Sequence, residues 1–469
     1  MPQTILAGLQ TLLGPDRFVT DPETVARRCL DTWPLRLVQK VVGAEPEPPL
    51  CVVRPATTAE VARTLTYLYG EGVPVIPYGG GSGVVGGIQP TRDSVVLDLG
   101  ALDQMISLNE ADLTVTAQAG VFLNHLEAWL NERGYICGHY PQSIDVAQLG
   151  GLVATRSAGQ FSTRYGNIED LLVGLEAVLP DGQILRIHDL PRRAVGPDLR
   201  HLLMGSEGAF GIITEVTLKV FPRPVERWMH AYAIADMRSG LRAIQAFMRE
   251  GWRPAVVRLH DAVEAERSYG SVVGAGECIL LLLSEGPAGL VQAESTALHG
   301  AITAQGGRPL GAAPVEAWLH HRNDVHLFEQ LITMGIIVDT IEVAAGWSSI
   351  ANIYEQVTEA VRKTVPELLV ISGHSSHSYP QGTNLYFIWA AQPSRDPAEV
   401  ERVYNAVWQP VMESTLALGG TISHHHGVGR VRLPWVEREL GSGYRLLSGI
   451  KQMLDPRGLM NPGTLVQRP

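Results

Sequence analysis

Residues 77–87 read Pro-Tyr-Gly-Gly-Gly-Ser-Gly-Val-Val-Gly-Gly and directly follow the apolar run Val-Pro-Val-Ile at residues 73–76. Glycine has no Cβ, so a glycine-rich loop can take positive φ values and let a ligand lie against its backbone. Successive N–H groups that point inward form a concave anion site, to which Ser82 can add a hydroxyl donor. The stretch therefore predicts a diphosphate-binding loop, with a mobile surface loop as the alternative.

This loop differs from two common phosphate-binding motifs. It lacks the Lys-Ser/Thr pair of a P-loop, and its spacing does not give the strand, GxGxxG and helix of a Rossmann turn. The loop therefore belongs to neither of these two motif classes.

Two further blocks of small residues follow. In residues 141–170, Gly150, Gly151 and Gly159 leave room for a flat ring system against the backbone. A helix whose Gly-Gly pair packs tightly on a sheet is the alternative interpretation of that block. Residues 205–215 read Gly-Ser-Glu-Gly-Ala-Phe-Gly-Ile-Ile-Thr-Glu, which is typical of a buried turn leading into a strand.

The three stretches, in this order, resemble the vanillyl-alcohol oxidase type (PCMH type) of FAD-binding domain. The resemblance implies that the first stretch holds the diphosphate of FAD through Tyr78, Gly79, Gly80, Gly81, Ser82, Gly83 and Val84. It implies that the flavin and ribityl chain are lined by Pro141, Ser143, Gly150, Gly151, Ser157, Gly159, Tyr165, Gly166 and Ile168. It assigns the adenosine end to Glu207, Gly208, Gly211, Ile212 and Ile213, and it adds Asn461 from the C-terminal segment. Some relatives bond the flavin covalently to a histidine in the loop; this loop has none, so we expect non-covalent FAD.

A run of three histidines marks the C-terminal part, in Ser423-His424-His425-His426-Gly427-Val428-Gly429-Arg430. Imidazole titrates near neutral pH, so the run can supply a general base. A metal site and a solvated run are the alternatives. We expect the segment to be extended, with His424 pointing away from the face that His425 occupies.

The histidine run is most similar to the matching segment of alkylglycerone-phosphate synthases, and residues 454–463 resemble the end of FAD-linked oxidases, where the chain returns to the flavin. D-lactate and glycolate dehydrogenases of the same superfamily carry Glu-His-Gly at that place. Tyr386 matches the active-site tyrosine of the synthases. We expect His425 or His426 to accept the hydroxyl proton, with His424 beside them. We expect Arg258, Arg322 or His374 to orient the substrate anion.

The sequence departs from the synthases at Phe328, where they carry an arginine that grips the substrate phosphate. An aromatic ring cannot make a bidentate contact to phosphate. Residues 372–379 partly resemble a metal-binding stretch of some hydroxyacid dehydrogenases. In that comparison His374 keeps the first ligand, whereas Tyr386 and His425 replace a histidine and a glutamate. We therefore expect no metal.

Composition narrows the possible partners. The net charge of −11 argues against nucleic acid or an anionic membrane as an obligate partner. Cys29, Cys51, Cys137 and Cys278 are scattered, which favours free thiols in a reducing compartment. The apolar run 278–283 is far shorter than a membrane span, and no basic residue precedes the apolar residues 5–9. We expect a cytoplasmic protein that binds a small anionic molecule; a homodimer and the identity of the electron acceptor stay open.

The chain of 469 residues is long enough for about two or three domains. After residues 221–224 the pattern changes to alternating helices and strands, which favours an α+β domain with an antiparallel sheet. There we expect helices over 240–250, 314–334 and 348–365, and strands over 255–260, 277–284, 368–372 and 384–391. The predicted fold is α+β: a two-part FAD-binding domain over 1–222, a cap domain over 223–410 and a returning C-terminal segment over 411–469.

These features predict an FAD-dependent oxidoreductase that oxidises a small 2-hydroxy acid or related alcohol by hydride transfer to flavin N5. The first alternative is a synthase-like, ether-forming reaction through a flavin adduct. The second is a non-catalytic flavin-binding protein, because the site matches neither family in full.

Overall fold

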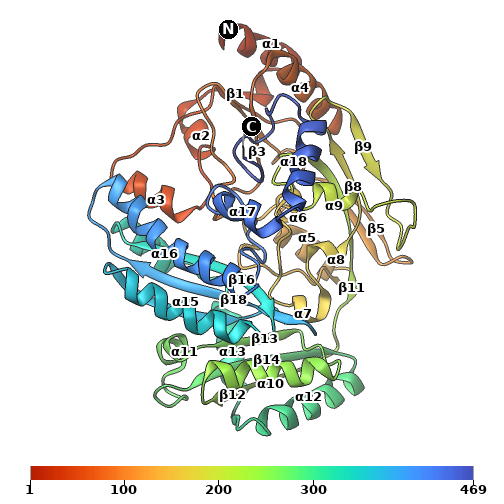
Figure 1. The fold of residues 1–469 in the computed structure, drawn as a ribbon. Coiled ribbons are helices and arrows are strands. Elements are labelled where there is room, and N and C mark those ends of the chain that lie inside the picture. Colours follow the sequence, from red (N-terminus) through yellow and green to blue (C-terminus); the bar gives the residue numbers. More distant parts are fainter. Residues whose placement is uncertain (1, 468–469) are drawn as a thin grey trace.

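Three large β-sheets, each with its own helices, build the molecule, and the computed structural model describes residues 2–467 (Figure 1). Sheets of four and five strands form the N-terminal half, and a seven-stranded sheet forms the domain that follows. This arrangement confirms the predicted α+β class, the two-part N-terminal domain and the antiparallel sheet of the cap.

The first lobe has the strand order β1-β2-β4-β3, with β2, β4 and β3 parallel. Helix α4 makes the crossover, and it begins where the Thr57 side chain accepts a hydrogen bond from the Glu60 N–H at 3.1 Å. The glycine-rich loop follows the carboxyl end of β3, the edge of a parallel sheet at which ligands usually bind. The elements are α1 (Pro2–Leu13), η1 (Pro15–Arg17), β1 (Phe18–Val19), α2 (Pro22–Arg27), α3 (Pro34–Val41), β2 (Cys51–Val53), α4 (Thr58–Glu71), β3 (Val75–Tyr78) and β4 (Val95–Asp98).

The second lobe is an antiparallel sheet of order β5-β6-β10-β8-β9. The elements are β5 (Met105–Asn109), β6 (Thr114–Gln118), α5 (Leu123–Asn131), β7 (Tyr135–Ile136), α6 (Leu149–Ala154), α7 (Ser162–Tyr165), α8 (Ile168–Leu171), β8 (Leu172–Val178), β9 (Ile184–Ile187), α9 (Arg200–Leu203), β10 (Ile212–Lys219) and β11 (Phe221–Pro222).

The cap sheet has the order β15-β12-β14-β13-β17-β18-β16, and all its pairs are antiparallel. Its strand β14 is apolar over residues 278–283 because both faces are covered: Leu280 and Leu282 pack on one side, and Leu281 and Leu283 on the other. The elements are β12 (Glu226–Ile234), α10 (Met237–Arg249), β13 (Val256–His260), α11 (Ala262–Tyr269), β14 (Cys278–Gly286), α12 (Ala288–Thr303), β15 (Arg308–Gly311), α13 (Ala313–His321), α14 (His326–Thr333), β16 (Ile337–Gly346), α15 (Ile350–Thr364), β17 (Leu368–Ser375), β18 (Gly382–Ala391) and α16 (Pro397–Ala417).

Two boundaries differ from the sequence expectations. The helix expected over 314–334 is broken between α13 and α14, where Asp324 Oδ1 accepts a hydrogen bond from the His326 N–H at 3.0 Å and starts the second helix. Helix α16 runs without interruption across residue 410, at which we expected the cap to end.

The C-terminal segment returns from the cap to the first lobe. After α17 (Leu433–Leu440) and α18 (Gly443–Leu454), Met460 bridges Val75 in parallel, so the chain end lies against the free edge of β3. The histidine run lies between α16 and α17, where the cap meets both N-terminal lobes (Figure 1).

All four cysteines are buried and form no disulfide, as expected. Between residues 2 and 467, none of the helices has both the length and the apolar character that crossing a membrane requires.

Candidate active site

The glycine-rich loop presents a row of backbone donors. Within the described chain, the N–H groups from Gly79 to Val84 donate to no protein acceptor. Gly81 has φ +70°, and a Cβ built on Gly80 would lie 1.8 Å from the Val146 carbonyl oxygen, so these two positions require glycine. A diphosphate supplies the acceptors that these donors lack, and the loop therefore fits the anionic part of FAD.

The second block divides into residues that pack and residues that face open space. A Cβ on Gly150 would lie 2.8 Å from the Ala119 Cβ, so this glycine allows α6 to approach the second lobe. A Cβ on Gly151 would meet nothing within 4 Å. Gln148 Oε1, three residues earlier in the chain, is buried and has no partner among residues 2–467, and the same holds for His139 Nδ1. Open space beside unpaired polar atoms fits a bound ring system.

Glu207 and Asn461 tie the site together. The Glu207 carboxylate accepts hydrogen bonds from the Val428 N–H at 2.6 Å and the Gly429 N–H at 2.8 Å. Burial, opposed by these two donors, raises the pKa of Glu207 to about 7. The Asn461 side chain donates to the carbonyl oxygens of Gly87 and Glu207 at 3.0 and 2.7 Å. The two residues therefore join the glycine-rich loop to the segment that follows the histidines; their predicted contact with FAD stays a prediction.

The histidine run is not extended, which corrects the expectation that its neighbours face apart. His424 Nδ1 and His425 Nδ1 lie 2.8 Å apart, so both rings belong to one cluster. The segment bends because Glu342 Oε1, on β16, accepts from the His425 N–H at 3.0 Å and the His426 N–H at 2.7 Å. Two consecutive donors that converge on one oxygen exclude the alternation of a strand.

Charged and polar neighbours hold the Glu342 carboxylate in place. Its carboxylate pairs with the buried Arg432, and its Oε2 lies 3.1 Å from His426 Nδ1. Burial opposes ionisation of Glu342, but Arg432 and His426 outweigh it and hold its pKa well below the usual value. The sequence analysis gave this residue no role. Two acidic residues inside the otherwise apolar strand 337–346, Asp339 and Glu342, were the signal.

The second lobe contacts the histidines through Tyr379. The Tyr379 hydroxyl accepts from Asn167 Nδ2 at 2.8 Å and lies 2.7 Å from His424 Nε2. Ser162 Oγ lies 2.7 Å from His377 Nδ1, and the rings of His377 and His424 stack at 5.0 Å. Sequence reasoning also missed Tyr379 and His377, whose only signal was the polar run 372–379 after an apolar strand.

Burial keeps the clustered imidazoles neutral. It lowers the pKa of His424 to about 4 and holds that of His425 well below its ordinary value. At neutral pH each ring carries one proton and one lone pair, which is the form that can accept a proton.

His377, His424 and His425 also have metal-ligand chemistry, since their donor atoms lie within 4.8 Å of one another. This set shares only His425 with the positions that the sequence comparison suggested. Several of its nitrogens already serve the hydrogen bonds to Tyr379, Ser162 and each other. The expectation of no metal stays a prediction.

Arg258 and His374 belong to a closed network beside the histidines. The guanidinium donates from Nε to His260 Nε2 at 2.9 Å and from an Nη nitrogen to His374 Nε2 at 2.8 Å. The other nitrogens of the two rings bind the two oxygens of Glu264, at 2.9 and 3.0 Å. Burial, and next the charge of Arg258, lower the pKa of His374 to about 3. His374 is thus neutral, with both ring nitrogens in hydrogen bonds, which leaves it no free atom for a proton or an anion.

Tyr386 connects this network to the histidines. Its ring stacks on His374 at 4.8 Å and on His425 at 5.9 Å. Burial raises the pKa of Tyr386 to about 12. Arg322, the remaining sequence candidate, contacts none of these residues; its guanidinium carbon lies 5.9 Å from the centre of the Trp318 ring, and that of Arg258 lies 5.5 Å from the same ring.

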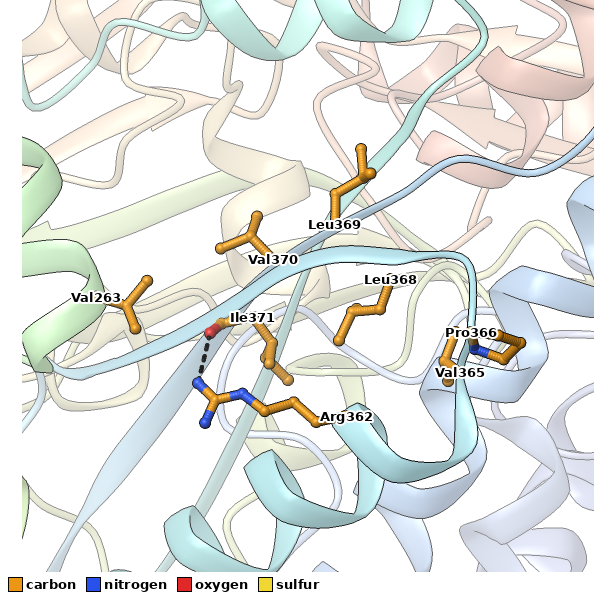
Figure 2. Close-up of a pocket in the computed structure, with 8 residues that line it drawn as sticks. All are labelled: Val263, Arg362, Val365, Pro366, Leu368, Leu369, Val370 and Ile371. Atoms are coloured by element: carbon orange, nitrogen blue, oxygen red, sulfur yellow. Dashed lines mark hydrogen bonds between the residues drawn. The ribbon is translucent and has the colours of Figure 1, made fainter.

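A separate hollow of about 390 Å³ lies between α11, α15 and β17 (Figure 2). It is lined by Val263, Arg362, Val365, Pro366, Leu368, Leu369, Val370 and Ile371. Arg362 donates to the Ile371 carbonyl oxygen at 3.4 Å, and the rest of the lining is apolar. The hollow holds none of the candidate residues, and the histidine cluster stays the candidate active site.

Two family descriptions match the chain: "FAD binding domain" over residues 49–188 and "FAD linked oxidases, C-terminal domain" over residues 224–465. An uncharacterized FAD-linked oxidoreductase of Escherichia coli is 38% identical over 98% of this chain and 98% of its own. Alkyldihydroxyacetonephosphate synthase of Dictyostelium discoideum is 27% identical over 92% of this chain and 75% of its own. D-lactate dehydrogenase of Archaeoglobus fulgidus is 27% identical over 89% of this chain and 91% of its own.

A solved structure of alkyldihydroxyacetonephosphate synthase superposes with a TM-score of 0.82 at 23% identity, covering 98% of this chain and 84% of the other. At that identity the likeness concerns the fold.

Proposed function

Because the chain belongs to the FAD-linked oxidases, and is therefore an FAD-dependent oxidoreductase, we propose that it oxidises a small 2-hydroxy acid or a related alcohol. The chemistry that bound FAD supplies is acceptance of the hydride that leaves the substrate carbon. The residues that would hold the cofactor are the loop 79–84, the open space at Gly151 and the polar atoms beside it.

One observation carries the proposal. Arg258, His374, Tyr386 and His425 follow one another in direct contact, so a fixed cation and a neutral imidazole lie at the two ends of one short series. Only part of the Arg258 guanidinium is used in hydrogen bonds to the two histidines. A guanidinium binds a carboxylate well, because its paired N–H groups match the two oxygens. The neutral His425 can take the hydroxyl proton as the substrate carbon becomes a carbonyl.

The proton has a path away from His425. Its Nδ1 faces His424 Nδ1, and His424 Nε2 faces the Tyr379 hydroxyl. If His425 gains a proton at its other nitrogen, it can pass the Nδ1 proton to His424, whose Nε2 lies against the Tyr379 hydroxyl. The positive charge then leaves His425 for His424, and His425 can act as a base again once the proton taken from the substrate has also left it.

Anaerobic mixing tests the proposal. Holoprotein is mixed with a panel of 2-hydroxy acids, and the flavin absorbance is followed. We expect at least one acid to bleach the flavin and to yield its 2-oxo acid, and an added electron acceptor to restore the colour. If no hydroxy acid or simple alcohol bleaches it, the proposal is wrong.

A synthase-like reaction is the second candidate, favoured by the synthase relative and by the place of Tyr386 beside the histidines. Against it stands Phe328 on α14, which packs in an apolar cluster with Ile336, Val338 and Ala390. A phosphate-binding arginine has no counterpart there. Turnover of an acylated glycerone phosphate without net flavin reduction would favour this candidate.

We also propose that FAD is bound without a covalent bond, because the loop 79–87 contains neither histidine nor cysteine. Acid precipitation of the yellow protein should leave the flavin in the supernatant. Colour that stays in the pellet would contradict this.

A further inference from the structure

Arg322 lies in an environment that does not neutralise its charge. Its guanidinium carbon is 5.6 Å from the centre of the Phe161 ring of the second lobe and 5.9 Å from that of Trp318 of the cap. Over residues 2–467, Arg322 forms no hydrogen bond and no ion pair, and its Nε is buried without a partner. A guanidinium stays charged at every ordinary pH, so this one carries donors that the protein does not satisfy.

The side chain lines a cavity of about 400 Å³ between the two domains. The second lobe contributes Glu127, Asn131, Ile136, Tyr140 and Phe161; the segment that connects β11 to β12 and the start of β12 contribute residues 223–227, and α13 contributes Leu319. The wall beside Arg322 is aromatic and aliphatic, through Tyr140, Phe161 and Leu319. A cavity of this size holds a small organic molecule.

The acidic residues near the cavity are already used or lie at its rim. Glu127 accepts from the Cys137 N–H at 2.9 Å and from the Tyr140 hydroxyl at 2.8 Å. Glu285 binds Arg227 at 2.7 Å and the Tyr165 hydroxyl at 2.7 Å. Glu226 and Arg223 are exposed and oppose each other in charge. Arg322 is therefore the one lining group whose charge is buried in part and unmatched within the described residues.

We propose that this cavity is an anion-binding site for a small organic acid, whose carboxylate or phosphate binds Arg322 and whose apolar part lies against Phe161 and Leu319. The site goes beyond the proposed oxidation, which uses a different guanidinium, Arg258. The rings of Phe161 and Trp318 lie near the Arg322 guanidinium, and its N–H groups are left to bind a bidentate acceptor.

Calorimetric titration of the FAD-loaded protein tests the site with three probes: phenylacetate, phenyl phosphate and inorganic phosphate. We expect one of the two aromatic probes to bind more tightly than inorganic phosphate, and the tighter of them identifies carboxylate or phosphate as the preferred group. Arg322→Met should weaken that binding about tenfold to a hundredfold, the range of a lost charge-assisted pair. Arg322→Lys should lose less, because it keeps the charge without the fork.

Arg242→Met is the matched control, since it removes an exposed arginine from α10, outside the cavity, and should leave the affinity unchanged. His425→Asn should also bind the probe normally, which separates this site from the proposed oxidation. The inference is overturned if no aromatic probe binds the parent protein, if inorganic phosphate binds as tightly as both, or if Arg322→Met and Arg322→Lys bind like the parent.

Discussion

At the scale of single residues, the three adjacent histidines have three different environments. His424 lies between Tyr379 and His425, His425 lies against Tyr386, and His426 lies beside Glu342. Only His425 combines a neutral ring with contact to Tyr386 by stacking and to His424 by hydrogen bonding. Substitutions at the three positions should therefore change the rate of flavin reduction by different amounts.

His425→Asn should slow flavin reduction by about a hundredfold or more, because asparagine keeps a polar group and removes the titratable one. FAD content should stay unchanged. His424→Asn should have a smaller effect, since His424 acts through His425. Stopped-flow absorbance under anaerobic conditions measures both.

The control is His326→Asn, the same chemical change at an exposed position on α14. It should reduce at the parent rate. Equal rates in all four proteins would show that the base lies elsewhere.

At the scale of elements, the glycine-rich loop shows that its glycines are not equivalent. A side chain at Gly80 would collide with the Val146 carbonyl oxygen before any ligand is considered. At Gly79 the nearest atom to an added Cβ is Gln148 Oε1, at 3.5 Å, an ordinary contact. Gly79, unlike Gly80, can therefore report on the space that a ligand needs.

Gly79→Ala should lower FAD affinity with little change in the stability of the apoprotein. An added methyl group against a close-packed ligand costs about 1–3 kcal/mol, as overpacking does in protein cores. Flavin retention after dialysis and apoprotein melting measure the two effects. Full flavin retention would place the diphosphate elsewhere.

Strand β16 and the histidine segment depend on each other through Glu342. Glu342→Ala leaves the buried Arg432 without its counterion, which should lower the free energy of unfolding by about 3–5 kcal/mol. Glu355→Ala removes a carboxylate from an exposed pair with Arg238 and should change it little. Urea unfolding of both variants measures the difference, and equal values would contradict the role given to Glu342.

At the scale of the whole molecule, stability should decline in mild acid. His139 is fully buried, and burial lowers its pKa from 6.5 to about 4. Between those values the unfolded chain takes up a proton that the folded chain does not, so stability is lost as pH falls. From pH 6.5 to 5 the loss for one such group is about 2 kcal/mol.

His139→Gln should therefore show a shallower decline than the parent over this range. His326→Gln, at an exposed position, should keep the parent slope. Parallel slopes in parent and His139→Gln would contradict the assignment.

The sequence was sufficient for the fold and for the elements that carry the site, because local patterns encode them: the glycine-rich loop after β3, the Thr57 cap of α4 and the apolar run of β14. It was insufficient for the contacts between distant segments. The bend that joins His424 to His425 is caused by Glu342, which is 83 residues from His425. The network that occupies His374 requires Arg258 and Glu264 on other elements, and no short-range pattern contains it.

The bond from Asn461 to Gly87 links residues 374 positions apart. During synthesis, the glycine-rich loop emerges from the ribosome long before Asn461, whose side chain donates a hydrogen bond to it. A nascent chain that has completed both N-terminal lobes still lacks the histidine segment, the Glu207 contact to Val428 and the strand partner of Val75. The site is therefore complete only after residue 461 has been made, and a chain that stops before residue 424 carries the glycine-rich loop without the histidine run.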